Sequence, residues 1–239
     1  MDKGKYVATE EGSAQGNIIS PVLANIYMHF VLVLWYKEIV QKRAKGDTFL
    51  VVYADDFIAG FQYKYEAEAY YEALKKRMSK FGLELEESKS RLLEFGRYAE
   101  GNRKARGERK PETFDFLGFT FYCSKSRSGK FSVKLKTSKK KFRQKVKAMK
   151  VWLYQNRDIK VSDLMEQVKI KLIGHYRYYG ISHNGRMISC FRQRTIDFLY
   201  KILNRRSHKK SYTVEGFKEM LKVYKLPYPK IYISLFDWK

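Results

Sequence analysis

Apolar residues follow two different spacings along this chain. Between residues 20 and 136, helical three- and four-residue spacing alternates with short runs that are continuously apolar or apolar at every second position. From Thr137 onward helical spacing predominates. It predicts helices with Asn, Gly or Ser breaks between them, at 138–154, 162–179, 186–206 and 213–224. The pattern therefore predicts an α+β part followed by an all-α part.

Strand patterns are concentrated in the first of these parts. The apolar runs 49–53 and 57–61 flank a short polar tip, which predicts a β-hairpin. Residues 114–123 and 129–136 alternate apolar and polar positions around a Ser/Lys/Gly turn, which predicts two further strands.

The segments between these hairpins carry weaker patterns. Residues 64–81 place apolar side chains on one helical face, and Gly82 is the expected helix stop. Short strands are expected at 83–85 and 91–95, and the densely charged stretch 100–112 is expected to form a loop.

One apolar run, residues 18–36, is as long as a membrane span. Pro21, Asn25 and His29 interrupt it, and the sequence contains no second hydrophobic span. The favoured interpretation is a buried helix of a large domain, with Ser20 as its N-cap, and no membrane partner is expected.

Charge is distributed unevenly between the two parts of the chain. The formal net charge is +24, yet residues 1–96 hold 13 Lys/Arg against 14 Asp/Glu, while residues 97–239 hold 36 against 11. Such a basic part can bind nucleic acid, bind an anionic membrane or merely keep the protein soluble, and nucleic-acid binding is favoured. Cys123 and Cys190 have neither metal-site spacing nor a disulfide framework, so a reducing, cytoplasmic location is expected.

Two adjacent carboxylates, Asp55 and Asp56, lie at the tip of the first predicted hairpin. Burying charge is costly, so a carboxylate pair between apolar strands needs a reason. One reason is Mg²⁺, which prefers oxygen ligands and is often held by one or two carboxylates together with substrate phosphates. The other interpretation is an ordinary polar turn, in which Asp is common.

Four ordered motifs resemble those of reverse transcriptases: "GSAQGNIISPVLANIYMHFVLVLW", "VVYADDF", "LELEESKSRLLEFG" and "FDFLGFTF". The downstream segments "GHYRYYGISHN", "FRQRTIDFLYKILNRRSHKKSYT" and "LPYPKI" resemble the thumb, or maturase X region, of group II intron reverse transcriptases. This resemblance implies a partial polymerase palm, an antiparallel sheet with packed helices, at 1–136. It implies a helical thumb/X region at 137–239.

The resemblance also implies roles for individual residues. Asp55 and Asp56 match the aspartates that hold two catalytic Mg²⁺ ions, and Lys89 matches a lysine close to the leaving pyrophosphate. The residues that match nucleotide- and primer-binding positions are Gln15, Tyr53, Ala54, Leu117, Gly118 and Phe119. Lys89 can also be a solvated lysine, and Leu117 and Phe119 ordinary core residues.

Basic clusters in the second part are candidates for phosphate contacts. The expected nucleic-acid-binding residues are Lys139, Lys140, Lys141, Arg143, Arg177, Arg205, Arg206, Lys209 and Lys210. The tyrosines around Arg177 are expected to pack mainly in the core.

The family takes a third metal-binding aspartate from a strand upstream of the "QG" loop, and residues 1–11 show no such strand. The chain is therefore expected to be part of a truncated or split protein, with an exposed apolar palm surface and a separate upstream fragment as partner. Two functions remain open. One is an RNA-directed DNA polymerase that uses intron RNA, an RNA template, a DNA primer and deoxynucleoside triphosphates. The other is a non-catalytic, maturase-like RNA-binding splicing cofactor.

Overall fold

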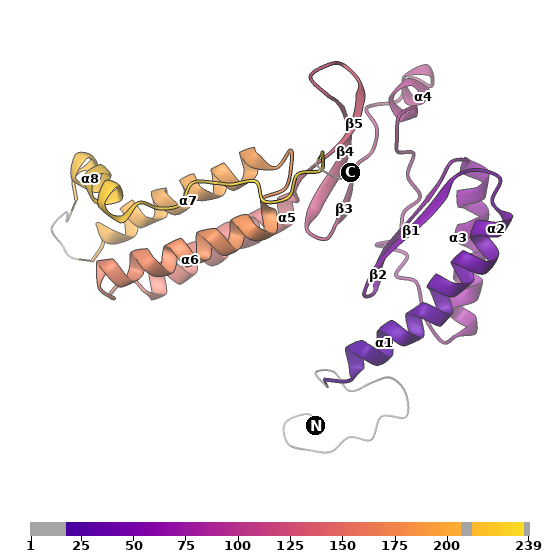
Figure 1. Cartoon of the computed structure of the whole chain (residues 1–239), viewed down its shortest axis with the longest axis horizontal. Coiled ribbons are helices and arrows are strands. Elements are labelled where there is room, and N and C mark those ends of the chain that lie inside the picture. Colours follow the sequence, from indigo (N-terminus) through magenta and orange to yellow (C-terminus); the bar gives the residue numbers. More distant parts are fainter. Residues whose placement is uncertain (1–17, 207–211, 237–239) are drawn as a thin grey trace. The chain divides into compact units, whose positions relative to one another are not determined.

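The computed structural model describes residues 18–206 and 212–236. The chain divides into two compact units, the first ending at Glu94 and the second beginning at Phe95 (Figure 1). Helices and two small antiparallel sheets make up the described residues, which confirms the predicted α+β class. The expected palm–thumb boundary at residue 136 lies inside the second unit, and the assignment of palm and thumb stays a prediction.

The first unit packs one long helix and a second helix against a β-hairpin. The long helix consists of α1 (Ser20–Met28), the π-helical segments η1 (His29–Leu34) and η2 (Tyr36–Val40), and α2 (Gln41–Arg43). The hairpin strands β1 (Thr48–Tyr53) and β2 (Asp56–Phe61) follow, and then α3 (Lys64–Lys80). Buried Val31, Leu32, Tyr36, Tyr70, Leu74 and Met78 form the core.

The hairpin has one face toward this core and one toward solvent. Leu50 and Val52 of β1 pack against the core, while Phe49, Val51 and Tyr53 are exposed. This alternation follows from the two-residue period of a strand. The predicted hairpin is confirmed, and its outer face is apolar and exposed.

The long helix corrects the expectation of a buried helix. Its buried side chains lie in its C-terminal half, whereas Val22, Leu23 and Ile26 of α1 are 50–56% exposed. Ser20 is the first helical residue rather than the N-cap, which is Ile19. The reason is that α3 and the hairpin cover only one end of this helix in the described part of the chain. Ser20–Arg43 is long and apolar enough to cross a membrane, with 17% of its apolar window buried.

The segment from 83 to 112 differs from the sequence prediction in two ways. Residues 83–85 and 91–95 have no regular secondary structure and join neither of the two sheets, so the predicted short strands are wrong. The expected loop at 100–112 begins instead with a helix, α4 (Ala99–Ala105).

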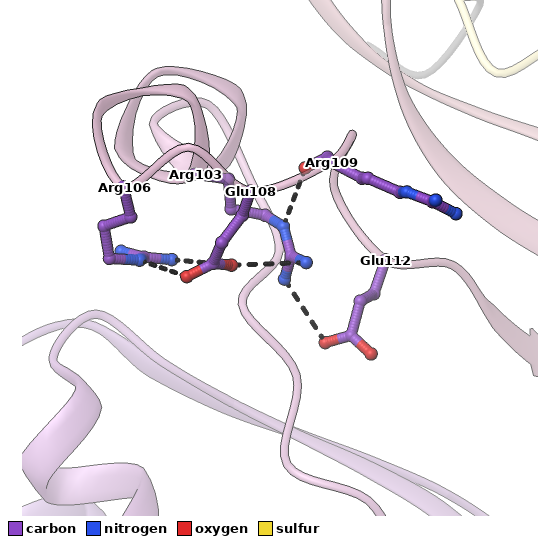
Figure 2. A network of polar contacts seen from close by, with 5 residues as sticks. All are labelled: Arg103, Arg106, Glu108, Arg109 and Glu112. Carbon is purple, nitrogen blue, oxygen red and sulfur yellow. Dashed lines mark hydrogen bonds and ion pairs between the residues drawn. The ribbon is translucent and has the colours of Figure 1, made fainter.

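Ion pairs hold the chain where it leaves α4. The Arg103 guanidinium lies 3.3 Å from Glu108 and 3.7 Å from Glu112, and its Nε donates to the Arg109 carbonyl oxygen at 3.0 Å (Figure 2). Arg106 also pairs with Glu108. Composition suggested a loop because these residues are nearly all polar, but positive and negative side chains are interspersed and form ion pairs with one another over a short distance.

In the second unit, α4 is followed by a three-stranded sheet of order β3-β4-β5 (Phe114–Phe116, Phe119–Lys125 and Phe131–Thr137). The first alternating run contains two strands instead of the predicted one, because a turn at Leu117-Gly118 divides it. The helices are α5 (Lys139–Gln155), α6 (Val161–Tyr179), α7 (Gly185–Leu203) and α8 (Val214–Tyr224). All four agree with the predicted helices to within a few residues at each end.

Asn184 joins the sheet of this unit to its helices. Its side chain is fully buried and accepts from the Thr137 amide at 2.7 Å. It donates at 2.8 Å both to the Thr137 hydroxyl and to the Tyr179 carbonyl oxygen. All these polar groups are satisfied, so the network fixes the end of β5 against the end of α6 at little cost.

Candidate functional site

The tip of the β1–β2 hairpin presents the two aspartates to solvent. Tyr53 and Asp56 form the last residue pair of the ladder, which leaves Ala54 and Asp55 as a two-residue turn. Ala54 has φ of 52°, and positive φ at the first central residue is a feature of type II′ hairpin turns. All four residues are exposed. The turn therefore presents two consecutive, exposed aspartates at the end of the strand pair.

This donor set fits a hard divalent cation with an incomplete protein shell. Asp55 and Asp56 offer carboxylate oxygens, and Mg²⁺ commonly takes one or two of these and completes its octahedron with water and phosphate oxygens. Within residues 18–206 and 212–236, no group of three or more His, Cys, Asp or Glu side chains is arranged to hold a metal. A cation held by Asp55 and Asp56 would therefore need further oxygen ligands, such as those of substrate phosphates.

Lys89 lies in a turn after α3, where its ammonium group is 3.8 Å from Glu86. Hydrogen bonding from Ser88, and then the charge of Lys89, lowers the pKa of Glu86. In the described part of the chain, no ion pair joins Lys89 to either aspartate, and its side chain is 81% exposed. The structure thus shows a solvated lysine here, and its catalytic role stays a prediction. Gln15 lies outside the described residues.

The turn at Leu117-Gly118 in the second unit is tightly constrained. Both residues have positive φ, 49° and 81°, as a type I′ hairpin turn requires. The Tyr178 hydroxyl donates to the Leu117 carbonyl oxygen at 3.1 Å, and the Ser138 amide donates to the Gly118 carbonyl oxygen at 2.9 Å. A Cβ on Gly118 would lie 3.4 Å from the Tyr179 hydroxyl oxygen. Glycine is therefore favoured here by its backbone conformation, while a Cβ would make only ordinary contacts.

Phe119, directly after this turn, is a core residue. It is 6% exposed, stacks on Tyr178 with ring centroids 6.1 Å apart and also packs on Tyr179. Leu117 and Gly118 are partly buried. A primer contact at this position would use the backbone of the turn rather than the Phe119 ring.

The predicted nucleic-acid-binding residues are mostly exposed. Lys139, Lys140 and Lys141 form the first turn of α5, which Ser138 caps by accepting from the Lys141 amide. Arg143, Arg177 and Arg205 are exposed as well, and Arg206 is partly buried. Lys209 and Lys210 lie outside the described residues. As expected, Tyr176 and Tyr179, on either side of Arg177, pack in the core, whereas Tyr178 is 55% exposed.

Sequence reasoning missed two kinds of residue that shape these surfaces. Asn184 positions the end of α6, and its only sequence signal is its place in the break before α7. Lys150 and Arg194 join Arg143 and Lys147 around a groove between α5 and α7. Helical spacing could have placed the α5 members on one face, but the α7 member depends on how the two helices pack.

Comparison with known proteins places these features in one family. A family model described as reverse transcriptase (RNA-dependent DNA polymerase) matches residues 2–121. The match includes the Asp55–Asp56 hairpin and the Leu117-Gly118 turn and covers half of the chain. No curated protein matches the sequence. The chain belongs to the reverse transcriptase (RNA-dependent DNA polymerase) family.

Proposed function

We propose that this chain is the Mg²⁺-dependent RNA-directed DNA polymerase and maturase of a group II intron, and that Asp55 and Asp56 are its metal ligands. The observation that carries the proposal is the two-residue turn that exposes both carboxylates at the tip of the hairpin. This turn lies inside the family match. The group II intron assignment rests on the motif resemblance of residues 174–231.

Members of this family generally use Mg²⁺, and the exposed carboxylate pair fits that ion. When bound, Mg²⁺ lowers the pKa of a primer 3′-hydroxyl and stabilises charge on the transferred phosphate. The chain's own contribution is to hold and orient the metal ligands, because the β1–β2 ladder fixes the backbone positions of Asp55 and Asp56. Phosphoryl transfer needs little else from a protein, because positioning and electrostatics supply most of the catalysis.

A non-catalytic function is the second candidate. It is favoured by the lack of a third carboxylate beside Asp55 and Asp56 in the part of the chain that the structure describes. In this case the basic surface of the second unit would stabilise folded intron RNA without nucleotidyl transfer. The positive charge of residues 95–239, 36 Lys/Arg against 11 Asp/Glu, serves either function.

The partner proposed for the first unit is a separate upstream fragment of the same kind of polymerase. Val22, Leu23, Ile26, Tyr27 and Phe30 form an exposed apolar face on the long helix. A hollow of about 420 Å³ lies between that helix and β1, whose second edge pairs with no strand in the described residues. Such a face is typical of a protein interface, and an open strand edge invites a further strand. Protein rather than membrane would then cover the helix, with the assembly in the cytoplasm.

Primer extension tests the proposed chemistry. The purified chain would be given an RNA template, a DNA primer, deoxynucleoside triphosphates and Mg²⁺, and compared with Asp55→Ala and Asp47→Ala. Asp47 is a matched control, because it is an exposed aspartate at the opposite end of the same hairpin. Both variants lose one negative charge, so a general effect of charge would change them equally.

We expect extension by the wild type and by Asp47→Ala, and a loss of at least ~100-fold in Asp55→Ala, because one metal ligand is removed. Extension by all three proteins would refute the assignment of Asp55. Absence of extension by the wild type, with salt-sensitive RNA binding retained, would favour the non-catalytic function.

A further inference from the structure

A groove of about 370 Å³ lies between α5 and α7 in the second unit. Its floor is apolar and consists of Phe142 and Val146 from α5 and Phe198 from α7. All three side chains are partly buried and pack against the core of the unit. The two aromatic rings are therefore held in place by packing while they line an open groove.

Positive charge surrounds this floor. Arg143, Lys147 and Lys150 contribute from α5 and Arg194 from α7, and all four are exposed. None of them forms an ion pair with a carboxylate of the described residues. The whole of α5 carries seven Lys/Arg and no Asp or Glu. These cations are thus available to an anionic ligand rather than neutralised within the protein.

The arrangement of the cations suits a polymer backbone. Arg143, Lys147 and Lys150 follow one face of α5 at steps of about one turn, or ~5 Å. Repeated cations along a line fit successive phosphates better than a single anion. The apolar floor beside that line can accept the flat face of a base.

We infer that this groove binds single-stranded nucleic acid, with a base packed on Phe142 and Phe198 and the flanking phosphates on the four cations. The inference rests on the proposed nucleic-acid binding and deepens it by naming the form of the ligand. A duplex keeps its bases stacked on one another, so only an unpaired base can reach the rings. The groove therefore favours single-stranded segments such as loops and ends.

An acidic amphipathic helix of a protein is the competing occupant, because it too would offer an apolar face and negative charge. Nucleic acid is favoured by two observations. The chain belongs to a family of nucleic-acid polymerases, and the basic surface continues along α5 beyond the groove to Lys139, Lys140 and Lys141.

Fluorescence anisotropy of the full chain tests the inference. The probes are a labelled single-stranded uridine dodecamer and an RNA duplex of the same length. The test variant is Phe142→Leu/Phe198→Leu, which retains apolar packing but removes both rings. The matched control is Tyr154→Leu, which removes an exposed aromatic ring from the same helix outside the groove.

Loss of stacking should weaken single-strand binding by about 10-fold or more in the double variant. Duplex affinity should change by less than about 2-fold, and Tyr154→Leu should bind both probes like the wild type. An unchanged single-strand affinity, or an equal loss on both probes, would overturn the inference while leaving the proposed function intact. A wild type that binds neither RNA would refute the proposed function itself.

Two further measurements complete the test. Photo-crosslinking of the wild type to a 4-thiouridine oligonucleotide does not depend on the folding of any variant, and it should label peptides that contain Phe142 and Phe198. Labelling confined to other peptides would contradict the inference. An acidic amphipathic peptide that binds the wild type more tightly than the dodecamer, and that loses affinity in the double variant, would identify a protein-docking groove instead.

Discussion

His175 shows at the scale of one residue how the helical core depends on protonation. It is 8% exposed, stacks on Phe191 with ring centroids 3.7 Å apart, and its Nε2 has no hydrogen-bond partner in the described residues. Burial, and then the nearby charge of Lys145, lowers its pKa from 6.5 to about 4. The folded protein therefore holds this imidazole neutral at a pH at which the unfolded chain protonates it.

Stability should fall in acid because of this group. Below the unfolded pKa of 6.5, the unfolded state binds a proton at His175 and the folded state does not. The contribution of His175 to the free energy of unfolding is therefore complete above pH 6.5 and is lost progressively down to pH 4. Between pH 7 and pH 5 the free energy of unfolding of the wild type should fall by about 2 kcal/mol more than that of a His175→Phe variant. Urea denaturation of both proteins at the two pH values measures this difference. Equal losses would show that His175 does not titrate as described.

Tyr70 gives a second prediction at the residue scale. Its ring packs between Trp35 and Phe61, but its buried hydroxyl has no partner in the described residues, and burial raises its pKa. Tyr70→Phe should therefore raise the free energy of unfolding by about 1 kcal/mol, because an unsatisfied polar group is removed.

Tyr36 is the matched control for this change. It lies in the same core, and its hydroxyl is hydrogen-bonded to the Thr48 hydroxyl. Tyr36→Phe should lower the free energy of unfolding by about 1 kcal/mol, since it breaks that bond and leaves Thr48 without it. Denaturant unfolding of both variants checks the opposite signs, and equal signs would contradict the explanation.

At the scale of elements, the sequence predicted the helices and strands that are determined by residues close together in the chain. The β1–β2 hairpin and α5 to α8 were found because strand and helix periods are strong there, and Ser138 and Thr213 cap their helices with side chains. Segment 83–85 was mistaken for a strand because a strand also needs a hydrogen-bonded neighbour, which the sequence does not reveal. The same reasoning found the aspartate pair, which one turn creates, but missed the α5–α7 groove, which two helices create by packing.

In the first turn of α5, lysines that are expected to bind RNA lower the stability of the protein. Three lysines occupy the positive end of the helix dipole, where cations are unfavourable by roughly 0.3–1 kcal/mol each. Lys139→Glu/Lys140→Glu should therefore raise the free energy of unfolding by about 1 kcal/mol at low salt while it weakens RNA binding. Urea denaturation and anisotropy measure the two effects. In ~1 M salt the stability gain should vanish because the charges are screened, and a gain that persists would exclude the dipole as its cause.

At the scale of the whole molecule, charge and structure divide the chain at the same place. Residues 1–94 hold 13 Lys/Arg against 14 Asp/Glu, and residues 95–239 hold 36 against 11. The first unit carries the aspartate pair on a nearly neutral body, and the second carries the excess of cations. We infer that the second unit supplies most of the affinity for RNA and that this affinity depends steeply on salt.

The salt dependence tests this division. The logarithm of the binding constant should fall linearly with the logarithm of the salt concentration, with a slope of about −0.7 to −0.9 for each phosphate neutralised. Arg177→Gln/Arg205→Gln, in the second unit, should reduce the slope by about 1.5, whereas Lys42→Gln/Lys64→Gln, in the first, should leave it unchanged. Both pairs remove two exposed cations, so total charge is matched. Equal reductions would mean that net charge alone governs binding, and a larger effect of the first-unit pair would place the RNA on the other unit.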